Sequence, residues 1–204
     1  MTDLLILRPD KARCFEHIAD ILTFFALTFG GTNIVFVGGP SRARFSCLAG
    51  NMELAGHLTG FDDTLRTGKL PGIITFTRSE KLPAPESGEV PGIKSINTRI
   101  IGAIFAVFVD KASDWVKANV STDYYNWPPV SNFARIVRNA IVHGGTINLK
   151  DEEARVAWSG VEISAQNYGD RILNTGKLSL GDLLLLMFNL EEELDGLGAP
   201  LDLG

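Results

Sequence analysis

The sequence has few of the residues that build metal centres and disulfide frameworks. It contains two cysteines, Cys14 and Cys47, and three histidines among 204 residues. The cysteines are neither spaced as a zinc-binding pair nor numerous enough for a disulfide-rich secreted protein. The sequence therefore predicts no metal and no cofactor, and it favours the reducing environment of the cytoplasm.

Long uninterrupted apolar runs are also missing. Residues 21–40 carry no charge, but Gly30, Gly31 and Asn33 interrupt them in the manner of a helix stop and a turn. A bilayer-spanning helix needs about 20 consecutive apolar residues. The N-terminus has the acidic Asp3 and no basic segment, so we expect neither a secretory signal nor a membrane partner.

Positive charge is absent from the C-terminal end. The net charge is −5, and no Lys or Arg follows Lys177. Without the six acidic residues beyond that point, 18 of the 24 acidic residues remain against 19 basic ones. A nearly neutral body permits a local anion site but not a broad electrostatic footprint for long duplexes. The acidic end is typical of a solubilising tail, with mimicry of nucleic acid towards a partner as the alternative.

Internal repeats and low-complexity tracts are absent as well, and 45% of the residues are hydrophobic. A chain of this length and composition can bury its own core, so we expect one domain over residues 1–204. Prolines and glycines between positions 79 and 95 predict a mobile loop inserted in that domain. Residues 196–204 are expected to form a tail.

Apolar periodicity makes helices the main expected elements. The expected helices cover residues 9–29, Asn97 or Thr98 to 119, Ser131 or Asn132 to 143, residues from the Ser179 cap onward and, more weakly, 45–55. Short strands are expected at residues 33–37 and 73–77, and a β-hairpin at 154–164. The sequence thus predicts a mostly α fold with a small β-hairpin accessory and a loop insertion rich in proline and glycine.

The helix expected over residues 131–143 separates its side chains into two faces. At about 100° per residue, the apolar side chains gather on one side of the helix. The opposite side carries Arg135, Arg138, Asn139 and His143, and no carboxylate of this helix shares it. Two guanidiniums, a carboxamide and an imidazole predict a phosphate-binding face. An ordinary solvated helix side is the alternative.

These side chains could support metal-free cleavage of RNA. A histidine titrates near neutral pH, so His143 can take a proton from a ribose 2′-hydroxyl or give one to a leaving oxygen. Arg138 can stabilise the charge of the transition state, Asn139 can orient the imidazole or the substrate, and Arg135 can hold the RNA backbone. Because both an acid and a base are needed and the helix supplies one histidine, we expect a homodimer with two such helices at one cleft.

Three aromatic residues precede this helix: Tyr124, Tyr125 and Trp127. They could stack on unpaired bases beside the phosphate site, which makes them predicted substrate contacts. The adjacent Pro128 and Pro129 favour another interpretation, in which the rings pack under a turn. Both interpretations are open from the sequence.

The segment from Arg138 to His143 resembles the motif of HEPN domains, in which an arginine and a polar residue are followed, after a spacer, by a histidine. The resemblance implies an up-and-down helical bundle, usually a homodimer. It also implies a metal-independent ribonuclease of a toxin, antiviral or RNA-processing system. On this resemblance, Arg138 and His143 match the catalytic pair and Asn139 matches its polar partner. The motif does not account for the first half of the chain.

Two other functions are open from the sequence. The same face could bind RNA or a nucleotide without cleaving it. Alternatively, the helical surface and the acidic end could dock a partner protein, such as a cognate toxin or a nuclease. For the ribonuclease, a cognate antitoxin or a regulator is the partner that the sequence leaves open. Tolerance of the protein in growing cells would separate the docking function from an active ribonuclease.

Overall fold

The computed structural model describes residues 3–30, 42–57, 67–80, 91–173 and 177–203. The helices and strands, in chain order, are β1 (Asp3–Leu7), α1 (Phe15–Gly30), β2 (Arg42–Cys47), β3 (Met52–His57), β4 (Ile74–Glu80), α3 (Pro91–Asn119), α4 (Pro129–Val142), β5 (Arg155–Trp158), β6 (Val161–Ser164) and α5 (Leu180–Gly196). Short 3-10 turns occur at Ala49–Asn51, Tyr124–Asn126 and Ala165–Asn167.

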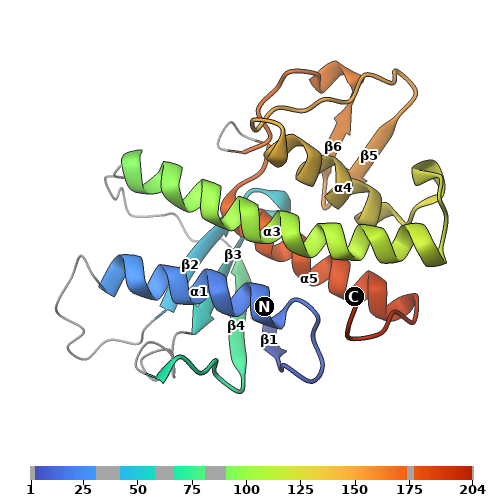
Figure 1. Cartoon of the computed structure of the whole chain (residues 1–204). Helices are drawn as coiled ribbons and strands as arrows, with labels where there is room; N and C mark the ends of the chain where they lie inside the picture. Colours follow the sequence, from blue (N-terminus) through green and yellow to red (C-terminus); the bar gives the residue numbers. More distant parts are fainter. Residues whose placement is uncertain (1–2, 31–41, 58–66, 81–90, 174–176, 204) are drawn as a thin grey trace.

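This is a mixed α/β fold, with 48% helix and 22% strand, so the expected mostly α, HEPN-like up-and-down bundle is wrong. Figure 1 shows α3 crossing the molecule, with α1 and the four-stranded sheet on one side and α4 with the β5–β6 hairpin on the other. Among the described helices, none is long and apolar enough to cross a membrane.

The sequence predicted only one strand of the four-stranded sheet: the strand expected over 73–77 is present as β4. The strand order of the sheet is β1-β4-β3-β2, and all neighbours are antiparallel. The weak helix expected over 45–55 is wrong, because Phe45 pairs with Leu54 and Cys47 with Met52 across β2 and β3. The spacing of three and four residues in this stretch joins positions on two separate strands and is not one helical stripe.

Several expected elements are present with different ends. α1 begins at Phe15 and not at residue 9, since the amides of Lys11 and Ala12 both donate to the Arg8 carbonyl and form a separate turn. α3 begins at Pro91, ahead of the expected caps, and proline is well suited to a first helical turn. The strand expected over 33–37 and residues 81–90 of the expected loop lie outside the described residues.

The expected β-hairpin is present and packs against α4. Its turn residues, Ser159 and Gly160, both have positive φ values of 46° and 81°, as a tight two-residue hairpin turn requires. Trp158 is buried, and its ring centroid lies 5.5 Å from that of Phe133 on α4. The indole Nε1 of Trp158 donates to Asn189 on α5 at 3.0 Å. The hairpin therefore covers the apolar side of α4.

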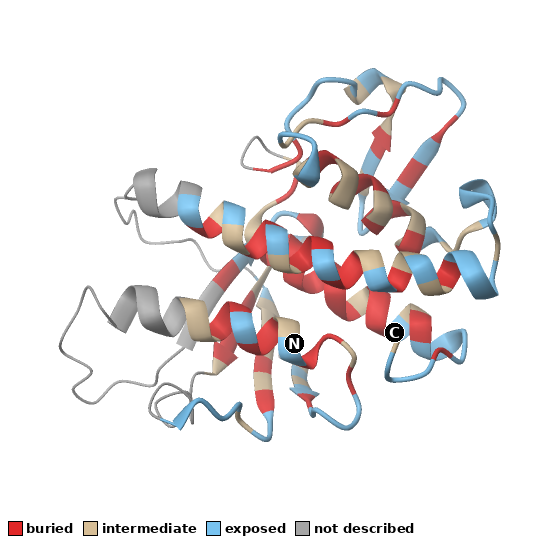
Figure 2. Ribbon diagram, in the orientation of Figure 1, coloured by how far each residue is buried: buried red, intermediate tan, exposed pale blue. Residues whose placement is uncertain are grey.

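α5 connects the sheet to the rest of the core. Its cap, Ser179, is as expected, and the buried Asp182 completes a capping box with it. The same carboxylate accepts hydrogen bonds from the amides of Leu48 and Ala49 at 3.0 and 2.9 Å. In Figure 2 the buried residues concentrate where the helices face each other and the sheet. The largest fully buried side chains include Phe15, Phe76, Phe105, Phe108 and Phe133.

The acidic end of the chain is part of the folded body, so the solubilising-tail interpretation is wrong. The Glu191 carboxylate is buried against Arg13, which also contacts Asp195. The Arg13 guanidinium donates to the carbonyl of Pro200 at 2.8 Å, and this bond holds the chain after α5 in place. Glu193 accepts hydrogen bonds from the first turn of α4. Because these acidic residues contact the folded body, they do not form the free acidic segment that the partner-docking function was expected to use.

Replacing Gly181 with alanine is expected to destabilise the protein by about 1–3 kcal/mol. A Cβ atom at Gly181 would lie 2.6 Å from the backbone oxygen of Ser46, so either α5 or β2 must move. Gly196, near the other end of α5, has no atom within 4 Å of its Cβ position and is the matched control. Urea unfolding should give a lower midpoint for Gly181→Ala than for Gly196→Ala. Equal midpoints would contradict the close approach.

Candidate functional site

α4 carries the predicted site, and its first turn is capped from a distant part of the chain. The N-cap is Pro128 with Pro129 in the first turn, so the caps expected at Ser131 or Asn132 are wrong. Glu193 of α5 accepts hydrogen bonds from the amide of Ser131 at 2.7 Å and from its hydroxyl at 2.5 Å. A carboxylate at this end is favoured by the helix dipole. This contact anchors α4 to the core.

The last turn of α4 ends as the sequence predicts. Gly144 and Gly145 have positive φ values of 88° and 83°, and the Gly145 amide donates to the carbonyl of Ala140 at 2.7 Å. This is the pattern of a Schellman motif. His143 forms the C-cap and is exposed. Within the described part of the chain, no hydrogen bond engages its ring, so the imidazole is accessible to a substrate.

Arg138 has an acidic partner that the helix alone could not show. Asp110, on α3, faces the guanidinium with both carboxylate oxygens, and Nη2 donates to Oδ2 at 2.7 Å. Nε lies 2.6 Å from Oδ1 as an ion pair, although its N–H is not aligned as a hydrogen bond. The helix supplies no carboxylate to this face, but Asp110 of α3 does, and it neutralises part of the charge of Arg138. Asp110 lies 28 positions before Arg138 and on another helix, so the pattern of residues 131–143 could not indicate it.

The ion pair orients Arg138 without using all its donors. Nη1 donates to the side-chain oxygen of Asn139 at 3.3 Å, so the structure brings these two predicted residues into contact. Each terminal nitrogen of a guanidinium carries two hydrogens. After the bonds to Asp110 and Asn139, one N–H on each of Nη1 and Nη2 is left for a further acceptor. Charged N–H donors of this kind bind phosphate oxygens well.

Arg135 joins the aromatic residues and not the ion pair. Its guanidinium carbon lies 4.3 Å from the ring centroid of Tyr124, and its Nη2 donates to Asn132 at 2.9 Å. Tyr124 in turn lies 4.5 Å from Tyr125, centroid to centroid. Burial lowers the pKa of Arg135 and the adjacent Tyr124 opposes this, but an arginine stays protonated at neutral pH. A cation and two tilted rings in contact therefore lie beside the first half of α4.

The structure separates the three predicted aromatic contacts. Tyr124 and Tyr125 are exposed, at 39% and 52%, so the interpretation that they pack under a turn is wrong for both. Trp127 is half-buried against the core and its Nε1 donates to the Ser121 carbonyl at 2.7 Å. Trp127 supports the turn, while the two tyrosines can meet a base.

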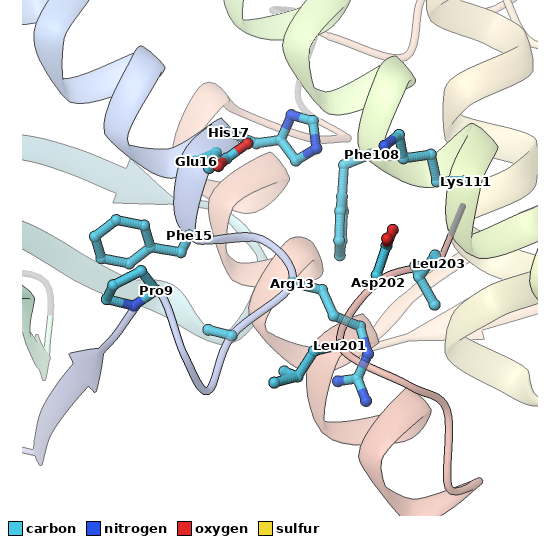
Figure 3. Close-up of a pocket in the computed structure, with 11 residues that line it drawn as sticks. Pro9, Arg13, Phe15, Glu16, His17, Phe108, Lys111, Leu201, Asp202 and Leu203 are labelled. Carbon is cyan, nitrogen blue, oxygen red and sulfur yellow. The ribbon is translucent and has the colours of Figure 1, made fainter. Parts of the chain in front are cut away.

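A separate cavity of about 210 Å³ lies between the start of α1, α3 and the chain after α5 (Figure 3). It contains His17, whose ring centroid lies 5.6 Å from that of Phe108. Burial lowers the pKa of His17, with Asp20 acting in the opposite direction. Glu16 and Lys111 bring opposite charges to the rim. None of the predicted site residues lines this cavity.

Comparison of the chain with protein-family models, curated proteins and solved structures finds no match. The functional argument therefore depends on the α4 face itself. That face combines an oriented guanidinium, a carboxamide in contact with it and an exposed imidazole on one short helix.

Proposed function

We propose that this chain is a metal-independent endoribonuclease with HEPN-type chemistry that acts in the cytoplasm in a toxin, defence or RNA-processing context. The observation that carries the proposal is the contact between the half-buried Arg138 and Asn139 on α4, with the exposed His143 at the end of the same helix. The guanidinium is held ready by Asp110 and retains two N–H groups for a phosphate. The exposed pair of Tyr124 and Tyr125 favours RNA with unpaired bases as the substrate.

The reaction that fits these groups is a transesterification within the RNA chain. His143 takes the proton of the 2′-hydroxyl, and the freed oxygen attacks the adjacent phosphorus. The bond from phosphorus to the 5′-oxygen breaks, and a second imidazole protonates the leaving oxygen. Arg138 stabilises the negative charge that collects on the phosphate oxygens. The products are a 2′,3′-cyclic phosphate and a 5′-hydroxyl.

The second imidazole comes, in this proposal, from a second copy of the chain. Val107, one turn before Asp110 on α3, and Val142, one turn after Arg138 on α4, are both about half exposed. Burial of these two apolar side chains against another molecule would be favourable. A two-fold axis beside them would bring two His143 side chains to one cleft. A protein that is monomeric at full activity would contradict this arrangement.

The test is cleavage of a mixed pool of structured and single-stranded RNA by the purified full chain in the presence of a chelator, with the product ends mapped. We expect cleavage with cyclic phosphate and 5′-hydroxyl ends, and none of a 2′-O-methylated copy, which lacks the attacking hydroxyl. A His143→Ala protein purified in parallel controls for contaminating nucleases. Ends with 3′-hydroxyl and 5′-phosphate groups would contradict the mechanism.

One observation favours a second candidate function, RNA binding without cleavage. The carboxylate of Asp110 faces two of the three nitrogens of Arg138 and neutralises part of its charge. A binding site can tolerate that, because Arg135 and the two tyrosines supply independent contacts. This function predicts retention of RNA by the parent protein with no turnover, and weaker retention after Arg135→Ala.

A further inference from the structure

A second exposed tyrosine next to a cation lies beyond the opposite end of α4. Tyr168 is 55% exposed, and the ammonium of Lys150 lies 5.5 Å from its ring centroid. This is within the range of a cation–π contact. Lys150 is itself exposed. The pair resembles the arrangement of Arg135 over Tyr124 at the start of the helix.

The backbone holds this second pair close to the end of α4. The segment that follows Tyr168 runs antiparallel to the segment that follows His143, with Thr146 bridged to Arg171. The amide of Ile147 donates to the Asp170 carbonyl at 2.8 Å, and the amide of Gly169 donates to the Ile147 carbonyl at 2.9 Å. Gly169, which follows Tyr168, is therefore hydrogen-bonded to a residue only four positions after His143. Tyr168 is held near the end of α4 in this way, although it lies 25 positions after His143 in the sequence.

The dimensions of α4 place the two aromatic sites on either side of the predicted phosphate site. The helix has 14 residues and is about 21 Å long. Arg135, whose guanidinium lies over the Tyr124 ring, precedes Arg138 by nearly one turn. Tyr168 lies beyond the C-terminal end of α4.

We infer that Tyr168 and Lys150 form a second nucleotide subsite, in which Tyr168 stacks on an unpaired base and Lys150 meets the adjoining phosphate. The inference rests on the proposed RNA function, and it assigns single-stranded RNA that extends to both sides of the reacting phosphate as the substrate. Stacking on a ring tolerates every base, whereas a base within a duplex is not available for it.

The experiment measures binding separately from cleavage. The probe is a fluorescent single-stranded oligonucleotide that is 2′-O-methylated at every position, so it cannot be cut by 2′-oxygen attack. Anisotropy titrations of the full-length protein give its Kd. We expect Tyr168→Ala to raise the Kd about five- to a hundredfold, the range of one lost base stack. Tyr168→Phe retains the ring and should bind as the parent does.

Two controls make the result specific. Lys69→Ala removes an exposed lysine from the segment that leads into β4 and should leave the Kd unchanged. The sheet that contains β4 and helix α4 lie on opposite sides of α3 (Figure 1). An oligonucleotide with an abasic position opposite Tyr168 should bind the parent more weakly and lose little further affinity with Tyr168→Ala, because both changes remove the same stack. A duplex of the same length should compete poorly.

The outcomes separate this inference from the proposed function. Parent and Tyr168→Ala proteins that bind the probe equally, or a parent that does not bind it, would overturn the subsite. Cleavage of unmethylated RNA by the parent, with no effect of Tyr168→Ala on binding, would leave the nuclease and remove the subsite. Binding that depends on Tyr168 without any cleavage would keep the subsite and contradict the nuclease.

Discussion

Replacing His143 with alanine is expected to lower the rate of RNA cleavage about 10²- to 10⁴-fold, since the variant loses general acid–base catalysis. Replacing Arg138 with alanine is expected to lower it about 10²- to 10³-fold, because the charge on the phosphate oxygens is no longer stabilised. Both side chains are at the surface of α4, so neither change should unfold the protein. Single-turnover cleavage of a defined RNA, with thermal unfolding of each variant, measures both effects.

The contact between Asp110 and Arg138 can act on cleavage in one of two ways: Asp110 either positions the guanidinium or competes with the phosphate for it. If the carboxylate positions the guanidinium, Asp110→Asn should reduce cleavage by about tenfold, the scale of a modest misplacement at a reacting centre. In an Arg138→Ala background the same change should add nothing, because its partner is gone. A partly exposed ion pair contributes only about 0–1 kcal/mol, so the loss of activity cannot come from unfolding. Faster cleavage by Asp110→Asn would show that Asp110 competes with the phosphate and does not position Arg138.

The features that sequence reasoning predicted correctly depend on residues close together in the chain. The cap at Ser179, the helix stop at Gly144-Gly145 and the turn at Ser159-Gly160 each use the backbone preferences of neighbouring residues. The spacing that grouped Arg138, Asn139 and His143 on one helix is equally local. Such local patterns can be recognised in the sequence without any tertiary contact.

The features that it missed depend on contacts between distant residues. Arg138 and Asp110 are 28 positions apart, and Ser131 and Glu193 are 62 apart. The pairing of the sheet could not be predicted for the same reason, since β1 pairs with β4, and α1, β2 and β3 lie between them in the chain. An acidic residue near the C-terminus has the same local pattern whether it is solvated or buried against a partner. Net charge therefore gave the wrong interpretation of the acidic end.

Replacing Glu191 with alanine is expected to destabilise the protein by about 3–5 kcal/mol, the cost of removing one partner of a buried ion pair. The side chains of Arg13 and Glu191 are only 4% and 9% exposed. Glu191 also accepts hydrogen bonds from the amides of Arg13 and Cys14 at 3.0 and 2.9 Å, and these donors would lose their acceptor. Asp195 still faces Arg13, so a guanidinium with one carboxylate is left behind.

Urea unfolding monitored by circular dichroism measures the effect, and Glu192→Ala is the matched control. Glu192 is the next residue on α5 and is exposed. Among the residues that the structure describes, its one hydrogen bond is a 3.3 Å bond accepted from Asn189, so its removal should change stability by less than about 0.5 kcal/mol. Glu191→Gln retains one oxygen acceptor without the charge and should fall between the two. If Glu191→Ala were as stable as Glu192→Ala, the contact would not hold the start of α1 against α5. Another contact would then have to hold the turn before α1 against α5, the helix whose Glu193 caps α4.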